Sequence, residues 1–154
     1  MTLEVDVQIA SEDDDLPDFE RVRAWANAAA SRLRDDAELT IRFVDEDESA
    51  HLNATYRGKS GATNVLSFPF EPPPGVALSL LGDVVICAPV VKREAMDQSK
   101  LLQAHWAHMV VHGVLHLLGY DHVDDDDARE MESVETRILA DLGFDNPYEP
   151  RSVS

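Results

Sequence analysis

The chain has few of the features that mark secreted or membrane proteins. Cys87 is the only cysteine, which excludes an intramolecular disulfide, and its apolar neighbours predict a small buried core residue. No stretch approaches the roughly 20 apolar residues that a membrane-spanning helix needs. Residues 1–10 lack the basic start and the cleavage pattern of a signal peptide. We therefore expect a cytoplasmic protein that has no membrane partner.

Basic residues are also scarce. The chain has 13 lysines and arginines against 30 aspartates and glutamates, a formal net charge of -17. Read alone, this charge argues against a nucleic-acid partner, because phosphates attract basic surfaces. Salt limits the argument, since the Debye length is about 8 Å at physiological ionic strength. A locally basic cleft can therefore function on an acidic body, and solubility is the simplest explanation of the acidity.

The length and the hydrophobic pattern predict one domain. A chain of 154 residues with 44% apolar residues suits a single core, so residues 1–154 are taken as one domain. Apolar alternation and apolar runs predict extended segments at residues 3–10, 38–44, 64–70 and 81–88. Helical periodicity predicts helices at residues 18–35, 45–57, 89–96, 100–118 and 125–142. Strands and helices do not alternate steadily, which favours an α+β fold with helices packed on a small mixed sheet.

Helix 18–35 has an apolar stripe that is expected to face the core: Phe19, Val22, Trp25, Ala26, Ala29 and Leu33. The last predicted helix has a similar stripe: Met131, Val134, Ile138 and Leu142. It begins with four aspartates at residues 124–127. We expect these aspartates to stabilise the helix N-terminus rather than to bind magnesium, because negative charge is favourable there.

Five of the six histidines lie between residues 105 and 122. On a helix, His112 and His116 would lie on one face, about 6 Å apart along the axis. His122 would be rotated roughly 240° away on a continuing helix, so the helix must end before it. Gly119 suits the left-handed cap that would end it. Three imidazoles with one open position form a catalytic zinc arrangement, whereas isolated histidines are more often ordinary half-buried residues.

The histidine pattern lacks the glutamate that zinc peptidases carry. The spacing H-x-x-x-H-x-x-G-x-x-H is that of a large class of zinc peptidases, which place a glutamate base directly after the first histidine. Here that position is Gly113. A zinc ion can still lower the pKa of bound water to about 7, so hydroxide is available without that carboxylate.

Two neighbours of these histidines have alternative roles. His108 extends the same helical face one turn earlier, and is either a further ligand or supporting group, or a residue packed against the neighbouring helix. Asp121 either orients an imidazole by accepting its other N–H, or caps the helix, or faces solvent.

These motifs resemble a known family. Residues 112–122 read HGVLHLLGYDH and resemble the signature of the YbeY family of bacterial single-strand-specific endoribonucleases, the rRNA maturation factors. Residues 52–70, LNATYRGKSGATNVLSFPF, and residues 81–87, LGDVVIC, resemble two further blocks of that family. The resemblance covers about residues 39–143. Ser60 departs from it, because an aspartate is common there, and the acidic tail of the motif is unusually long.

The resemblance implies one zinc ion, held by His112, His116 and His122 in a cleft at the end of a central helix. It implies an α+β, YbeY-like metal-dependent hydrolase fold, which we assign to the single domain of residues 1–154. It also implies a catalytic role for Arg57. The activity would be zinc-dependent cleavage of single-stranded RNA, in maturation of the small-subunit rRNA 3′ end and in ribosome quality control. The partners would be rRNA and the ribosome or ribosomal proteins.

The chemistry of RNA cleavage agrees with these residues. The main demands are charge stabilisation on the phosphoryl oxygens and positioning of the attacking group, whether water or the 2′-hydroxyl. Arg57 suits the first demand through its planar fork and permanent charge, and Lys59 could add a substrate-phosphate contact. A solvated loop is the alternative for both. The scarcity of basic residues and the apolar segment that follows them argue against it.

Two other functions remain open. One is a zinc hydrolase of another kind, a peptidase or amidase, which would share the ligands but has no evident base here. The other is a non-catalytic ribosome assembly factor with a structural zinc. The acidity of the chain slightly favours this second function, because an acidic surface can dock on a basic ribosomal protein.

Overall fold

The computed structural model describes residues 2–33, 35–75, 79–121 and 124–148. Within them, one sheet has the strand order β1-β2-β4-β3. Strands β1 (Leu3–Ala10), β2 (Ala37–Val44) and β4 (Leu80–Cys87) are parallel. Strand β3 (Val65–Pro69) lies at the edge and pairs antiparallel with β4. The sheet is therefore mixed, as predicted.

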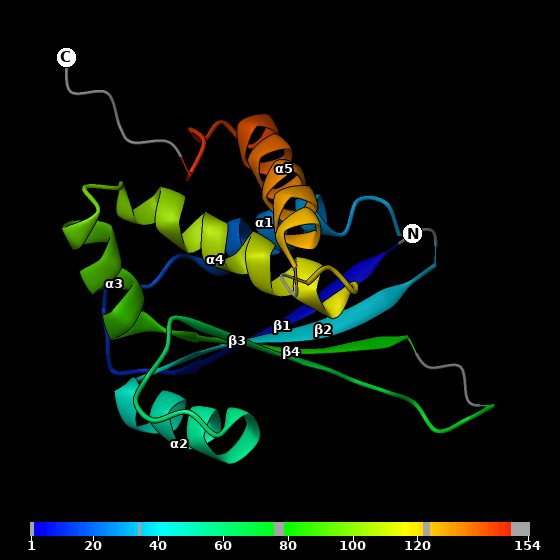
Figure 1. Cartoon of the computed structure of the whole chain (residues 1–154), viewed down its shortest axis with the longest axis horizontal. Helices are drawn as coiled ribbons and strands as arrows, with labels where there is room; N and C mark the ends of the chain where they lie inside the picture. Colours follow the sequence, from blue (N-terminus) through cyan, green and yellow to red (C-terminus); the bar gives the residue numbers. More distant parts are fainter. Residues whose placement is uncertain (1, 34, 76–78, 122–123, 149–154) are drawn as a thin grey trace.

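Helices cover both faces of this sheet. They are α1 (Phe19–Ala29), α2 (Glu46–Arg57), α3 (Ala88–Asp97), α4 (Leu102–Leu117) and α5 (Asp125–Asp141). Figure 1 shows α1, α4 and α5 over one face and α2 under the other. These layers confirm the predicted α+β class. No helix in the described part of the chain is long and apolar enough to cross a membrane.

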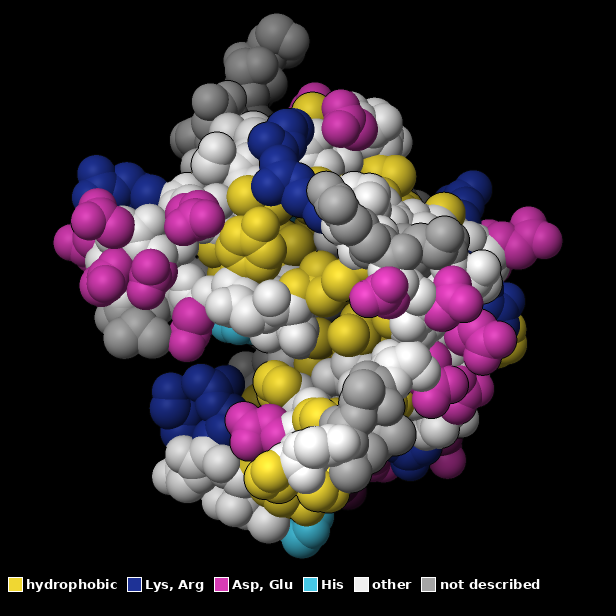
Figure 2. Space-filling model, turned by 90° about the vertical axis from the view of Figure 1, so that its right-hand side faces the viewer, with side chains coloured by type: hydrophobic (Ala, Val, Ile, Leu, Met, Phe, Trp, Pro, Cys, Tyr) yellow, Lys and Arg dark blue, Asp and Glu magenta, His cyan; other side chains and the backbone are white. Residues whose placement is uncertain are grey.

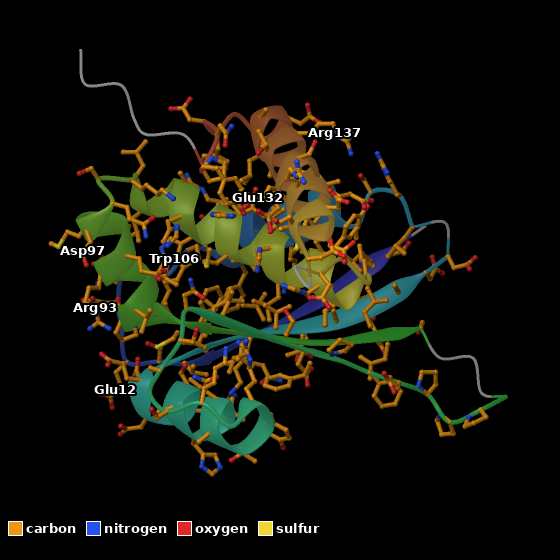
Figure 3. The ribbon with its side chains drawn as sticks, in the orientation of Figure 1. Glu12, Arg93, Asp97, Trp106, Glu132 and Arg137 are labelled. Carbon is orange, nitrogen blue, oxygen red and sulfur yellow. The ribbon has the colours of Figure 1, made fainter. Side chains whose placement is uncertain are left out.

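The main core lies between the sheet and the helices α1, α4 and α5. The alternating residues Leu39, Ile41 and Phe43 of β2 are all at most 2% exposed, so the predicted strand alternation is confirmed. Trp106 of α4 lies between its helix and the sheet (Figure 3), with its ring edge-on to Phe43 at a centroid distance of 5.6 Å. These contacts hold α4 against the middle of the sheet.

A smaller core lies on the α2 face of the sheet. It contains Leu66 of β3 and Val85 and Cys87 of β4, with Leu52 of α2 packed against them. Cys87 is 1% exposed, which confirms that it is a core residue. Burial raises the pKa of its thiol, so the thiol stays protonated at neutral pH.

Helix α1 is shorter than predicted. It ends at Ala29 rather than near residue 35, and the N–H of Leu33 bonds the carbonyl of Ala30 in a following turn. The chain turns here because it must return to start β2 parallel to β1. Leu33 still packs against the core from this turn. The core assignment of Phe19 is wrong, because this first residue of the helix is 44% exposed and packs instead against the guanidinium of Arg23.

Candidate functional site

Helix α4 carries four of the histidines and ends as the sequence predicts. Its last helical residue is Leu117, and Gly119 has φ 102°. Only glycine adopts such a conformation without strain, so the left-handed bend stops the helix and turns the chain back. Asp121 follows the bend and lines the same cleft as His116. His122, the third predicted ligand, lies outside the described residues.

A cleft of about 1050 Å³ lies between the end of α2, the edge strand β3 and the C-terminal half of α4. Arg57, His112 and His116 all line it. The rings of His112 and His116 are edge-on to each other, with centroids 4.7 Å apart. Figure 2 shows a notch in the surface with lysine or arginine side chains on one lip and a histidine in the opposite wall. The structure thus brings three of the predicted site residues into one cleft.

Lys59 lies outside the lining of this cleft. It is exposed, and its N–H bonds the carbonyl of Asn53 at 3.3 Å. The loop that carries it is fixed to α2, because Asn53 Nδ2 donates to the carbonyl of Gly61 at 2.9 Å and the Ser49 hydroxyl donates to the carbonyl of Thr63 at 3.0 Å. The loop therefore keeps the end of α2, with Arg57, beside the cleft.

Gly113 shows why no glutamate follows His112. A Cβ atom at this position would lie 2.5 Å from Cγ1 of Val84, closer than real Cβ contacts allow. The hydroxyl of Ser67 also donates to the Gly113 carbonyl at 2.9 Å, which ties α4 to β3. The residue after His112 thus faces the sheet. A carboxylate base of the peptidase kind cannot be placed there while α4 keeps this position.

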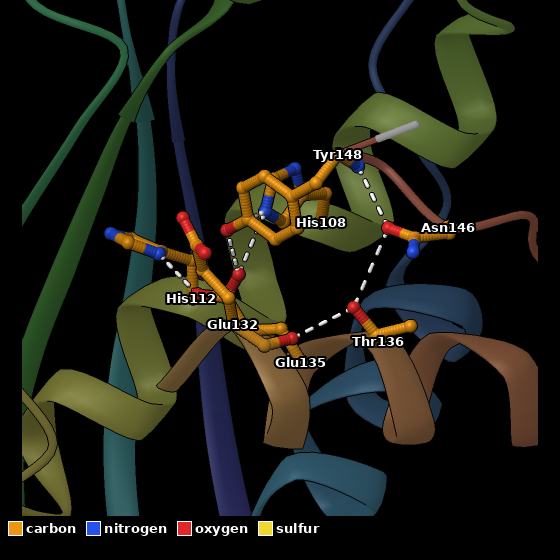
Figure 4. Close-up of polar contacts among 7 residues, drawn as sticks. All are labelled: His108, His112, Glu132, Glu135, Thr136, Asn146 and Tyr148. Atoms are coloured by element: carbon orange, nitrogen blue, oxygen red, sulfur yellow. Dashed lines mark hydrogen bonds and ion pairs between the residues drawn. The ribbon is translucent and has the colours of Figure 1, made fainter. Parts of the chain in front are cut away.

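Behind the cleft, three donors surround the fully buried carboxylate of Glu135 on α5 (Figure 4). Nδ1 of His112 lies 2.5 Å from Oε1. Nε2 of His108 lies 3.1 Å from Oε2. The hydroxyl of Tyr148 also donates to Oε2. The carboxylate is therefore hydrogen-bonded on both oxygens, as a buried charge requires.

The charges in this cluster follow from its contacts. Burial raises the pKa of Glu135, but hydrogen bonds from His108 and His112 outweigh burial and lower that pKa to about 2. Burial lowers the pKa of His108, and Glu135 opposes this only in part. Burial and the nearby carboxylate raise the pKa of Tyr148. At neutral pH the cluster therefore contains an ionised Glu135, a neutral His108 and a protonated Tyr148.

The sequence matches the family model of Endoribonuclease YbeY over residues 7–143. The chain belongs to this family. Its structure is also similar to the solution structure of TM1509 from Thermotoga maritima, with a TM-score of 0.62 and 24% identity. That match covers 93% of this chain and 99% of the other, and at this identity it shows the fold alone. Membership in the YbeY family supports a nuclease that acts in rRNA processing.

The donor atoms of this YbeY-family site suit a metal ion. Neutral imidazole nitrogens are common zinc ligands, and His112 and His116 line the cleft together. His108, His112 and Glu135 also each offer a ligand atom within 4.8 Å of the others, so this group could hold an ion. Both arrangements use His112. The residues of the YbeY-family site therefore fit a metal.

The sequence pattern allows two roles for His108, whereas the contacts of Glu135 and Tyr148 were not predicted. His108 is 7% exposed and hydrogen-bonded to Glu135 of α5, so it packs against the neighbouring helix and also supports the site. Glu135 had one usable signal, because it stands on the core stripe between Met131 and Ile138, where a charge is unexpected. Tyr148 had none, since its partners are distant in sequence.

Proposed function

We propose that this protein is a single-strand-specific, zinc-dependent endoribonuclease that matures the small-subunit rRNA 3′ end and acts in ribosome quality control. The carrying observation is the cleft in which Arg57 lies with His112 and His116. We assign the zinc to His112, His116 and His122, catalysis to Arg57 and a substrate-phosphate contact to Lys59. The protein acts in the cytoplasm as one domain, with rRNA and the ribosome or its proteins as partners.

Arg57 suits charge stabilisation in phosphodiester cleavage. Its guanidinium is permanently charged and can donate two parallel N–H bonds to the phosphoryl oxygens. A zinc ion, when bound, supplies a second positive charge for those oxygens. His112 and His116 line the same cleft as Arg57, so an ion that they hold and the guanidinium would act on one phosphate. Lys59, on the loop outside the lining, would contact the phosphate of a neighbouring nucleotide.

An exposed aromatic ring at the edge of the cleft favours a single-stranded substrate. Tyr56 is 66% exposed and lines the cleft next to Arg57. Its ring is edge-on to Phe68 of β3 at a centroid distance of 5.2 Å, which holds it in place. An unpaired base can stack on such a ring, whereas the bases of a duplex are already stacked on each other.

The peptidase alternative is disfavoured by Gly113. The close contact with Val84 leaves no room for the glutamate that would activate water against a peptide bond. Incubation with a generic peptide and with single-stranded RNA, each with and without a chelator, separates the two activities. We expect chelator-sensitive cleavage of RNA alone. Cleavage of the peptide and not of RNA would reject the nuclease proposal.

Substitution of Arg57 tests the catalytic assignment and the non-catalytic alternative together. We expect Arg57→Ala to reduce kcat/KM for a single-stranded RNA by about 10²-fold or more, the usual cost of removing one transition-state donor. Arg57→Lys should recover only part of this loss, because a lysine cannot form the planar fork. Elemental analysis should find about one metal equivalent in both variants.

A matched control is Arg93→Ala. Arg93 projects from α3 at the outside of the molecule, where it pairs with Glu46 at 3.7 Å (Figure 3). We expect this variant to cleave RNA at the normal rate.

His116→Ala should lose the metal. Undiminished RNA cleavage by Arg57→Ala, with folding and metal content intact, would reject the catalytic role and favour a non-catalytic assembly factor.

A further inference from the structure

We propose that Glu135 is the positioning residue of the metal centre: its carboxylate holds the proton of His112 on Nδ1 and turns Nε2 toward the cleft as the ligating atom. This inference rests on the proposed function, because it assumes that His112 binds the metal. It adds a residue from a helix that contributes no side chain to the lining of the cleft.

The contact between His112 and Glu135 determines which nitrogen is protonated. Nδ1 lies 2.5 Å from Oε1 of Glu135. The Glu135 carboxylate already accepts the hydroxyl of Tyr148 on Oε2, so at the Oε1 contact we take Nδ1 of His112 as the donor. An imidazole that binds a metal keeps its single proton on the other ring nitrogen, so Nε2 is the nitrogen of His112 that can ligate an ion. The side chain of His112 is 17% exposed and lines the cleft, so the ring bridges the buried carboxylate and the open site.

Glu135 is itself held in place. His108 and the hydroxyl of Tyr148 both bond Oε2, which leaves Oε1 for His112. Tyr148 is fixed in turn by Asn146, whose Oδ1 accepts the Tyr148 N–H at 2.9 Å. The carboxylate cannot rotate without breaking these bonds, so the His112 ring has one favoured orientation before any metal binds. Such a carboxylate–imidazole pair orients the ligand and raises its basicity.

An ion inside the buried group is the competing arrangement, because His108, His112 and Glu135 could also hold one. The present contacts argue against it. Zinc–oxygen and zinc–nitrogen bonds are each about 2.0–2.2 Å long, whereas Nδ1 of His112 and Oε1 of Glu135 are only 2.5 Å apart. An ion between these atoms would have to separate them, and it would displace the proton that joins them.

The first experiment needs no metal. Nitrogen-15 NMR of the histidine rings in the metal-free protein, under mildly alkaline conditions, reports which nitrogen of each ring is protonated. We expect His112 to carry its proton on Nδ1. A proton on Nε2 would overturn the inference, whether or not any variant of Glu135 folds.

The second experiment measures zinc affinity by competition with a chelator. We expect Glu135→Gln to weaken zinc binding about 10–100-fold, as loss of such a supporting group does. The matched control is Glu94→Gln. Glu94 of α3 makes the same kind of pair with Nε2 of His105 at 3.0 Å. His105 is on α4, as His112 is, but it does not line the cleft. We expect its zinc affinity to be unchanged.

The outcomes separate this inference from the proposed function. Equal zinc affinity of Glu135→Gln and the unsubstituted protein would reject the positioning role. Loss of the ion in His108→Ala, with His116→Ala still binding it, would place the ion in the buried group and also reject the role. Absence of zinc binding by the unsubstituted protein would reject the proposed metal centre, while the protonation of His112 would still decide whether Glu135 orients that ring.

Discussion

At the scale of single residues, the missing side chain of Gly113 allows α4 to lie close to the sheet. A Cβ there would meet Val84 at 2.5 Å and Val65 at 3.3 Å. We expect Gly113→Ala to destabilise the protein by about 1–3 kcal/mol, the usual cost of overpacking a core. Calorimetry should show the midpoint of thermal unfolding lowered by roughly 2–4 °C for each kcal/mol.

The same variant in a Val84→Ala background is the control. That second change removes the methyl groups of Val84 that a Cβ at residue 113 would meet. The penalty of Gly113→Ala should therefore shrink when it is measured against Val84→Ala alone, because the two sites are in contact. Equal penalties in both backgrounds would mean that the helix does not approach β4 at this point.

Tyr56 is the residue on which we expect a substrate base to stack. Because such stacking contributes about 1–3 kcal/mol per base, Tyr56→Ala should raise KM for single-stranded RNA about 5–150-fold and change kcat little. Tyr56→Phe should retain normal KM. Phe70→Ala serves as a second control, since Phe70 is 41% exposed but does not line the cleft. Steady-state kinetics on one oligonucleotide series would detect the difference.

At the scale of elements, the start of α5 depends on its first aspartate. Asp124 is the N-cap, and its carboxylate accepts the N–H of Asp127 at 2.8 Å. We expect Asp124→Ala to lower the free energy of unfolding in urea by about 1 kcal/mol. Asp126→Ala should cost much less, because its ion pair with Arg129 is on the surface. Similar losses in both would show that charge alone, not capping, stabilises this end.

The junction of α3, α4 and β3 should make stability depend on pH through Glu94. Burial raises the pKa of Glu94, but hydrogen bonds from His105 and Asn64 bring it below the ordinary value of 4.5. Because the pKa of Glu94 is lower in the folded chain, its ionised carboxylate stabilises the fold. This contribution to the free energy of unfolding is present above about pH 4.5 and is lost as the pH falls toward the folded pKa.

Thermal unfolding of the protein and of Glu94→Gln from about pH 3 to pH 7 isolates this contribution, because the other acidic groups are common to both. We expect the stability difference between them to be largest near neutral pH and to shrink on acidification. A difference that does not change with pH would mean that Glu94 has the same pKa in the folded and the unfolded chain.

Most elements could be predicted because their pattern is local. The alternation of Leu39, Ile41 and Phe43 identifies a strand whatever surrounds it, and Gly119 marks a helix end by its own conformational freedom. The end of α1 could not be predicted in this way, because it is set by the return of the chain to β2. Glu135 and Tyr148 depend on how α5 packs on α4, and local spacing carries no record of that packing.

At the scale of the whole molecule, strong acidity and an RNA substrate together predict a weak dependence on salt. With Arg57 and Lys59 as the two phosphate contacts, log K for single-stranded RNA should fall with log salt at a slope of about -1.4. Arg57→Ala should reduce that slope by about 0.7. A much steeper slope, measured by fluorescence anisotropy, would indicate a larger basic surface than this cleft.

Tyr148 lies beyond the stretch that the family model matches, which ends at residue 143, and its hydroxyl donates to Glu135. Two members of the family could agree at every position of the cleft and still differ in how firmly the first metal-binding ring is aligned. Trimming this protein after Gly143 would leave the lining of the cleft unchanged and take away the hydroxyl of Tyr148 that restrains Glu135. If Glu135 has the proposed role, Tyr148 also helps to position His112, although it does not line the cleft.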